Sequence, residues 1–182
     1  VGTSRVRHRV SVVQGERLAL EGCQSTQWDV HTKLDAKRVF ITSASYDGGL
    51  GGLAGADSIC QSLSDGAGLG GTWTAWLSDS TTDVSSRVTQ NDGYMLIDGM
   101  IIADSWADLT DGSLDNPINV DQSGNTVASQ TVYTGTASTG TKVTATFSSQ
   151  CEDWTYNGQQ GSKGGFYGDN SLTTSGWTNA GD

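Results

Sequence analysis

The sequence lacks any hydrophobic run long enough to cross a membrane, and it is very poor in proline and histidine. Among its 182 residues the longest apolar stretches, such as residues 99–103, have the length of a strand, whereas a membrane span needs about 18 apolar residues. Pro117 is the single proline, and both histidines, His8 and His31, lie near the start. We therefore expect no membrane span and, beyond residue 31, no catalysis that relies on histidine.

Cysteine is equally scarce, with Cys23, Cys60 and Cys151 as the three in the chain. No two cysteines, and no cysteine–histidine pair, have the spacing of a zinc site. Three is an odd number, so the cysteines cannot all pair with one another inside this chain. The chain begins at Val1 without Met or a signal segment, from which we expect a processed or trimmed product.

Basic residues are rare in the larger part of the chain. Residues 39–182 hold three basic and sixteen acidic residues, a net charge of −13, whereas residues 1–38 hold seven basic and four acidic residues, a net charge of +3. A body this acidic repels phosphate backbones, so we expect no nucleic-acid partner. The charge is otherwise typical of a well-solvated surface.

What the sequence does contain is glycine, with 25 residues, and six tryptophans spread along the chain. This distribution is typical of a folded domain, and the length predicts one. Apolar residues at helical spacing predict a helix over residues 53–63. The other predicted elements are strands over 38–43, 72–77 and 131–147, a type I′ hairpin over 94–102, a helical turn at 105–109, and loops over 110–131 and 157–168. The fold class predicted from these elements is α+β.

Residues 1–36 differ from the rest in charge and pattern. Val6, Val10 and Val12 share one parity in residues 5–13 and the arginines share the other, which predicts a strand with a basic outer face. Because the valine face needs burial, we expect this strand to lie against a sheet edge. That edge belongs either to its own chain or to a neighbouring copy.

Several motifs in residues 37–182 resemble a bacterial domain of unknown function that occurs in secreted proteins and lipoproteins. The motifs are KRVFIT (37–42), GGLAGAD (51–57) with Cys60, GTWTAWLS (71–78), ADSWADL (103–109), YTGT (133–136) and CEDWT (151–155). That domain in turn resembles endostatin, the C-terminal domain of a collagen. The resemblance implies a C-type-lectin-like fold for residues 37–182, with residues 1–36 outside it.

The resemblance also implies that Cys60 and Cys151 bond to two cysteines on a terminal strand that would begin after Asp182. Either the chain lacks that strand or residues 1–36, with Cys23, take its place. We therefore predict that Cys60 or Cys151 forms a disulfide with Cys23 or with a cysteine of such a segment. The zinc and heparin binding of endostatin is not expected here, because the basic surface and a histidine ligand set are missing.

No catalytic motif accompanies these features, so we predict a non-catalytic recognition module, extracellular or at the cell surface, for a glycan or protein ligand. Trp154, Trp177 and Tyr167 are the predicted ligand-binding residues, because glycines and polar residues surround them and favour exposure of the two tryptophans. The alternative is a structural subunit of a surface assembly, in which residues 1–36 exchange a strand with a neighbouring copy.

Residues 104–125 are dense in Asp and Asn, whose oxygens suit Ca²⁺. For a calcium site we expect Asp108, Asp111 and Asp115 in the first shell, with Asp121 or a backbone carbonyl completing it. The spacing is not that of an EF-hand. The alternative is a solvated loop in which Asp and Asn side chains form turns.

Overall fold

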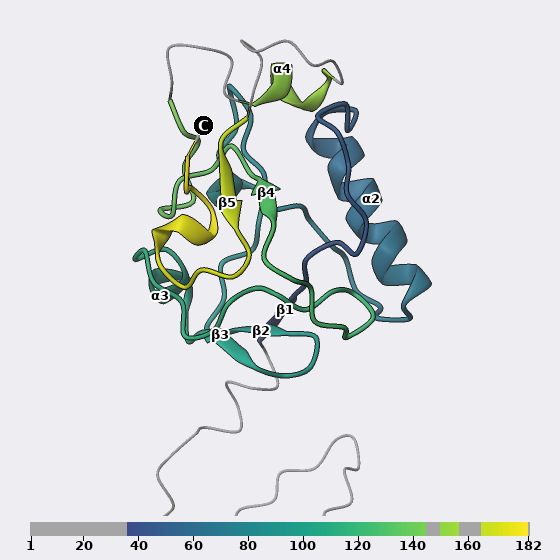
Figure 1. Cartoon of the computed structure of the whole chain (residues 1–182), viewed down its shortest axis with the longest axis vertical. Coiled ribbons are helices and arrows are strands. Elements are labelled where there is room, and N and C mark those ends of the chain that lie inside the picture. Colours follow the sequence, from purple (N-terminus) through teal and green to yellow (C-terminus); the bar gives the residue numbers. More distant parts are fainter. Residues whose placement is uncertain (1–35, 145–149, 157–164, 182) are drawn as a thin grey trace, which may run out of the picture.

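The computed structural model describes residues 36–144, 150–156 and 165–181. The described elements are β1 (Lys37–Val39), α2 (Gly52–Gly66), η1 (Val84–Ser86), β2 (Tyr94–Leu96), β3 (Ile101–Ala103), α3 (Trp106–Leu109), β4 (Thr131–Tyr133), α4 (Cys151–Trp154), β5 (Tyr167–Asp169) and η2 (Ser175–Trp177). Helices and strands are both short and are joined by long loops, which confirms the α+β class (Figure 1).

The larger sheet is mixed and has the order β1-β2-β3, with β1 parallel to β2 and β2 antiparallel to β3. The predicted hairpin therefore forms, but its turn is not type I′. Gly99 has a φ of 90°, whereas no non-glycine residue of this turn has a positive φ, and a type I′ turn needs two. The Leu96 N–H donates to the Met100 carbonyl at 2.8 Å and closes a loop longer than two residues.

The smaller sheet is the ribbon of β4 and β5, paired antiparallel with Thr131 opposite Asp169 and Tyr133 opposite Tyr167. The predicted strand over 131–147 is correct only at its start, because residues 134–144 are irregular and residues 145–149 lie outside the described residues. β5 falls where the sequence predicted a loop. Its partner strand β4 lies more than thirty residues earlier in the chain, so no local sequence pattern predicts β5.

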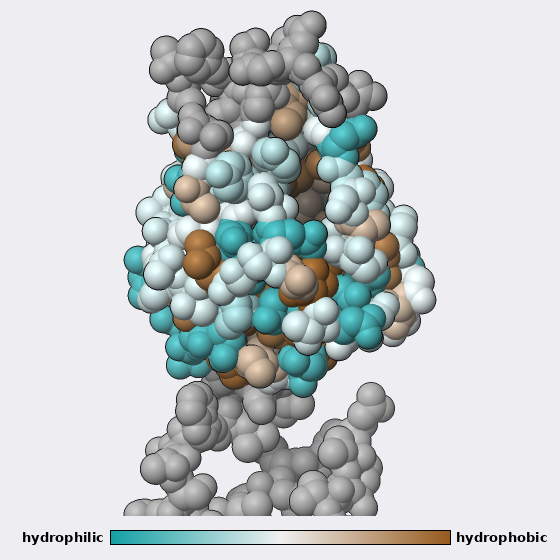
Figure 2. Space-filling view, in the orientation of Figure 1, coloured by the Kyte–Doolittle hydropathy of each residue, from teal (hydrophilic) through white to brown (hydrophobic). Residues whose placement is uncertain are grey.

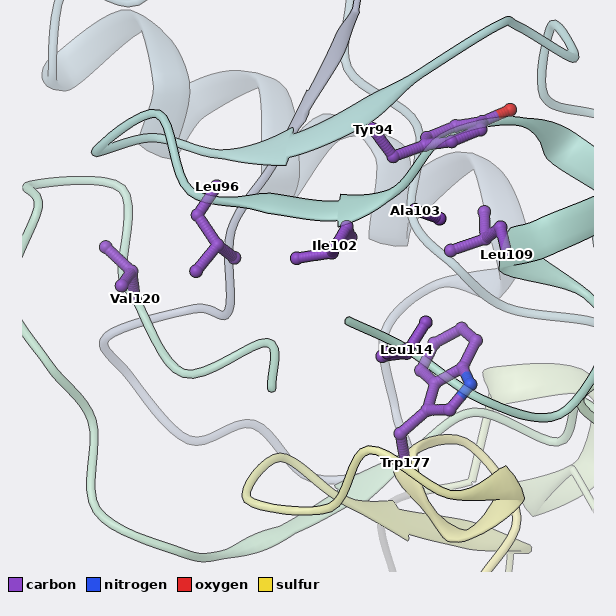
Figure 3. Packing of buried hydrophobic residues seen from close by; sticks show 8 residues of the cluster. All are labelled: Tyr94, Leu96, Ile102, Ala103, Leu109, Leu114, Val120 and Trp177. Carbon is purple, nitrogen blue, oxygen red and sulfur yellow. The ribbon is translucent and has the colours of Figure 1, made fainter. Parts of the chain in front are cut away.

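The main hydrophobic core lies beneath the three-stranded sheet and brings β2 and β3 together with α3 and η2 (Figure 3). Its buried members are Tyr94, Leu96, Ile102, Ala103, Leu109, Leu114, Val120 and Trp177. The side chains of Trp76 and Trp106, partly buried, pack against this cluster. The core thus joins the hairpin to the C-terminal part of the described chain.

Helix α2 lies along one side of the molecule and packs on a second core cluster (Figure 1). It contains the predicted helix over 53–63 and extends it at both ends. Ala56 is buried, and Leu53 and Cys60 are partly buried against Leu77 and Trp154. Part of the apolar spacing seen in the sequence therefore faces this cluster, whereas Ile59 and Leu63 lie beside a hollow at the surface.

Element α4 is a left-handed turn rather than an ordinary helix. Its four residues all have a positive φ, from 48° at Cys151 to 63° at Trp154. Each non-glycine residue in this conformation costs about 1–2 kcal/mol, so the contacts of the turn must offset the strain. Trp154 is fully buried, and the Asp153 carboxylate accepts the Ser80 N–H at 2.7 Å.

Residues 72–77 do not form the predicted strand. The backbone N–H of Ala75 donates instead to the Asp57 carboxylate at 2.8 Å, and its carbonyl accepts from Arg87 at 3.1 Å. Side chains thus take the backbone groups that a strand would offer to a neighbour. The prediction of a strand is wrong because these bonds come from distant segments.

Three further predictions concern residues that lie outside the described part of the chain. They are the strand over 5–13, its two alternative partners, and the part played by Cys23. Among the described residues, no helix has the length and hydrophobicity needed to cross a membrane.

Candidate metal and ligand sites

Three carboxylates converge at the end of β3 and around α3. Asp104 follows β3, Asp108 lies in α3 and Asp115 follows it, and one carboxylate oxygen of each lies within 4.8 Å of the others. The Asp104 N–H donates to the Asp108 carboxylate at 2.7 Å, and the Asp108 N–H donates to the Ser105 hydroxyl at 3.1 Å. The Ser105 cap therefore orients α3 so that Asp108 reaches Asp104. We call these three aspartates the acidic cluster.

The acidic cluster is electrostatically unbalanced. Burial raises the pKa of Asp115, and the negative charges of Asp108, Asp104 and Asp111 raise it further. Within the described part of the chain none of the three forms a salt bridge. A cation bound between the carboxylates would remove this repulsion, so the cluster has the donor atoms and the charge for a hard metal ion.

The predicted calcium ligands are only partly brought together. Asp108 and Asp115 belong to the acidic cluster, and Asp104, which the predicted first shell omitted, replaces Asp111 and Asp121. Asp104 directly precedes the Ser105 N-cap of α3, and Ser105 followed three residues later by Asp108 is a helix-start signal in the sequence that could have placed Asp104 beside the first turn.

Asp111 and Asp121 instead form turns, as the alternative interpretation predicted. The Asp111 carboxylate accepts the Ser113 N–H at 2.8 Å. Asp121 is buried, and its carboxylate accepts the N–H groups of Ser123 at 2.8 Å and Asn125 at 2.9 Å. Burial opposes ionisation of Asp121, but these hydrogen bonds outweigh it and lower its pKa. Both carboxylates hold loops in place.

The expectation that Trp154 and Trp177 are exposed is wrong. Their exposed fractions are 1% and 6%. The Trp154 indole N–H donates to the Ser78 carbonyl at 2.8 Å, and the Trp177 ring packs on Trp76 with centroids 5.1 Å apart. Glycine-rich flanks do not expose a tryptophan when distant segments close over it, so these rings offer no free face for a ligand.

Tyr167 is accessible, and a second tyrosine accompanies it. It is half-buried and meets Tyr133, which is 51% exposed, in a T-shaped contact with ring centroids 6.1 Å apart. The sequence-based prediction missed Tyr133. The Thr-Val-Tyr alternation of β4 would have placed it on the outer face of a strand. We call the two residues the tyrosine pair.

The described part of the surface carries shallow hollows. A shallow one of about 340 Å³ lies beside the start of α3, lined by Asn91, Asp92, Ser105 and Trp106 among others. Another of about 290 Å³ lies on α2, lined by Tyr46, Ile59 and Leu63 with two serines. The face in Figure 2 is mostly polar, and its hydrophobic residues are scattered.

The two described thiols are poorly suited to chemistry. Cys60 and Cys151 are both free in the structure. Burial, helped by the charge of Asp57, raises the pKa of Cys60 to about 11, and burial also raises the pKa of Cys151. A thiol of this kind stays protonated and is a weak nucleophile. The predicted disulfide stays a prediction, because Cys23 lies outside the described residues.

A scan against protein-family models and a search of curated proteins both find no match for the chain.

Proposed function

We propose that the protein is a non-catalytic recognition module, extracellular or at the cell surface, with a lectin-like, endostatin-like fold. The observation that carries the proposal is the tyrosine pair, an aromatic surface open to solvent on an otherwise polar ribbon. Tyrosine combines a large apolar face with a hydroxyl and is enriched at binding surfaces for that reason. The ligand in this proposal is a glycan or a protein.

The chemistry of the described side chains supports a binder rather than an enzyme in this proposal. They include no histidine, and both thiols have a raised pKa. The best-paired acid, Asp57, is held by Arg87 at 2.7 Å in a structural contact. An enzyme would need a nucleophile with its base or paired carboxylates in a cleft.

The proposal includes Ca²⁺ as the ion of the acidic cluster. Calcium–oxygen distances of about 2.3–2.6 Å place ligand oxygens at most about 5 Å apart, which fits carboxylate oxygens within 4.8 Å of one another. The ion would cross-link the end of β3 to α3 and to the loop that carries Asp115. Its role would be to hold these loops in place.

Calcium binding is tested by thermal unfolding of the full chain with millimolar Ca²⁺ and then with chelator. We expect Ca²⁺ to raise the midpoint, because an ion that binds only the folded state stabilises it by about 2.7 kcal/mol at a hundredfold excess over Kd. Asp108→Asn should abolish the shift. Asp65→Asn, an exposed position on α2 outside the cluster, is the matched control and should retain it. An unchanged midpoint in the unsubstituted protein contradicts a calcium site.

Recognition is tested by measuring retention of the full chain on fixed bacterial and animal cell surfaces. Tyr133→Ala and Tyr167→Ala should each reduce retention. Tyr46→Ala is the matched control, because Tyr46 is 44% exposed but lies outside the ribbon. Equal retention of all three variants would remove the tyrosine pair as the recognition surface.

A further inference from the structure

The outer face of the β4–β5 ribbon is defined by Gly168. A Cβ atom on this glycine would lie 2.1 Å from the Trp177 carbonyl oxygen. Gly168 therefore marks the inner face of the ribbon, which packs against η2, and the opposite face is the outer one. Successive strand residues point to opposite faces. Tyr167 and Asp169 therefore point away from η2, together with their cross-strand partners Tyr133 and Thr131.

This outer face places an aromatic surface beside a carboxylate. The tyrosine pair occupies one end of the ribbon, and Asp169 lies two residues further along β5, a distance of about 6–7 Å along a strand. Such a distance is comparable with the width of a pyranose ring. A ligand stacked on the rings would thus bring its edge to the carboxylate.

The Asp169 carboxylate is held in a fixed orientation and can accept hydrogen bonds from a ligand. Its Oδ1 atom accepts the Ser171 N–H at 2.8 Å and the Ser171 hydroxyl at 2.7 Å, and the Ser129 hydroxyl lies 3.1 Å from each carboxylate oxygen. These bonds lower the pKa of Asp169, so the group is ionised at neutral pH. Among the described residues no cation pairs with it. Oδ2 has fewer partners than Oδ1 and has room for a further donor.

We infer that this outer face binds a neutral glycan, with a pyranose ring stacked on Tyr133 and Tyr167 and its hydroxyls donating to Asp169. The inference rests on the proposed recognition function and names its ligand class. A pyranose has an apolar C–H face, which matches the tyrosine rings, and an edge of hydroxyl donors, which matches an ionised carboxylate. Asp169 and the charge of −13 on residues 39–182 repel uronates and sulfated sugars, which sets the preference for neutral ones.

The test is saturation-transfer NMR and calorimetry of the full chain with methyl glycosides of neutral hexoses, N-acetylhexosamines and glucuronic acid, and with their polymers. We expect binding of a neutral glycoside, with no measurable binding of the glucuronide. Tyr133→Ala should weaken binding about tenfold, the upper end of what one aromatic contact contributes. Asp169→Asn should weaken it as well, and Tyr46→Ala should leave it unchanged.

Tyr133→Phe is the control for a folding defect in Tyr133→Ala. It retains the aromatic ring, so it should still stack on the sugar and bind the glycan. Binding should also persist with chelator, since the ribbon contains none of the acidic cluster. The inference is overturned if no neutral glycan binds, if the glucuronide binds as tightly, or if Tyr133→Ala leaves the affinity unchanged. A further outcome is that the unsubstituted chain is still retained on enzymatically deglycosylated cells, whereas the tyrosine variants are not. In that case the recognition function holds, the ligand is a protein, and the glycan inference is overturned.

Discussion

Arg87 forms an ion pair with Asp57 in which its Nη2 atom lies 2.7 and 2.8 Å from the two carboxylate oxygens. The Nη1 atom of the same guanidinium donates to the carbonyls of Ala75 and Leu77 at 3.1 and 2.7 Å. One side chain thus joins α2, the irregular segment 72–77 and the end of η1. The Arg87 side chain is 12% exposed and the Asp57 side chain 35%, so the pair is only partly screened by water.

Arg87→Ala should lower the free energy of unfolding by about 3 kcal/mol, because it removes the cation from a partly buried carboxylate and the guanidinium donor from two carbonyls. Arg87→Lys should recover only part of this loss, since an ammonium cannot match the planar fork. Urea unfolding measures both. Lys142→Ala is the control: its 3.8 Å pair with Asp83 is more exposed and should contribute less than about 1 kcal/mol. Similar losses of stability for Arg87→Ala and Lys142→Ala would contradict the larger contribution expected of the Arg87–Asp57 pair.

The two buried tryptophans should respond differently to loss of the indole N–H. Trp154→Phe removes the 2.8 Å bond to the Ser78 carbonyl and should cost about 2–3 kcal/mol. The indole N–H of Trp177 is buried without a partner among the described residues, so Trp177→Phe removes an unsatisfied donor and should cost about 1 kcal/mol less. Denaturant midpoints of the two variants decide the order, and the reverse order would show that the Trp177 N–H has a partner.

Asp115→Asn should stabilise the cation-free protein at neutral pH. The folded pKa of Asp115 is raised above 3.8, so its unfavourable contribution appears as pH rises from 3.8 through the raised value. Removing the charge should increase the thermal midpoint by about 1–2 °C at pH 7 in chelator and should leave it unchanged below pH 3.8. Thermal unfolding across this range measures the effect. A lower midpoint at pH 7 would show that the repulsion is already neutralised.

Asp121→Asn should destabilise the protein at neutral pH, the opposite of the effect expected for Asp115→Asn, and serves as its comparison. The folded pKa of Asp121 is lowered below 3.8, so its stabilising contribution is complete above 3.8 and is lost as pH falls through the folded value. The variant should be less stable than the parent at pH 7, and the difference should vanish in acid. The same series of unfolding curves detects it, and a difference that persists in strong acid would indicate a packing defect.

Cys60 and Cys151 should react slowly in the folded protein while they are thiols. With a pKa of about 11 for Cys60, about 0.1% of this thiol is ionised at pH 8, compared with about 10% at the unshifted value. Ellman's reagent should therefore label it about a hundredfold more slowly before unfolding than after. Labelling the unfolded protein without reductant then counts the thiols. Fewer than three indicates the predicted disulfide, and three excludes it.

The sequence by itself predicted the elements whose signal is local. The apolar spacing of residues 53–63 identifies α2, and the apolar runs around Asp98 and Gly99 identify the β2–β3 hairpin. The α+β class follows from these elements. The density of Asp in residues 104–121 likewise indicated an acidic site, and Asp108 and Asp115 do meet there. Each of these signals lies within one short stretch of the sequence, so neighbouring side chains suffice to reveal it.

Only the tertiary structure decided which residues are buried and which meet across the chain. Trp154 is covered because it reaches Ser78, 76 residues away, and Tyr133 becomes part of a pair because β4 and β5 meet in register. Residues 72–77 have the composition of a strand, yet the side chains of Asp57 and Arg87 take their backbone hydrogen bonds. Burial depends on segments that are distant in sequence, and the same local pattern is compatible with either outcome until those segments pack.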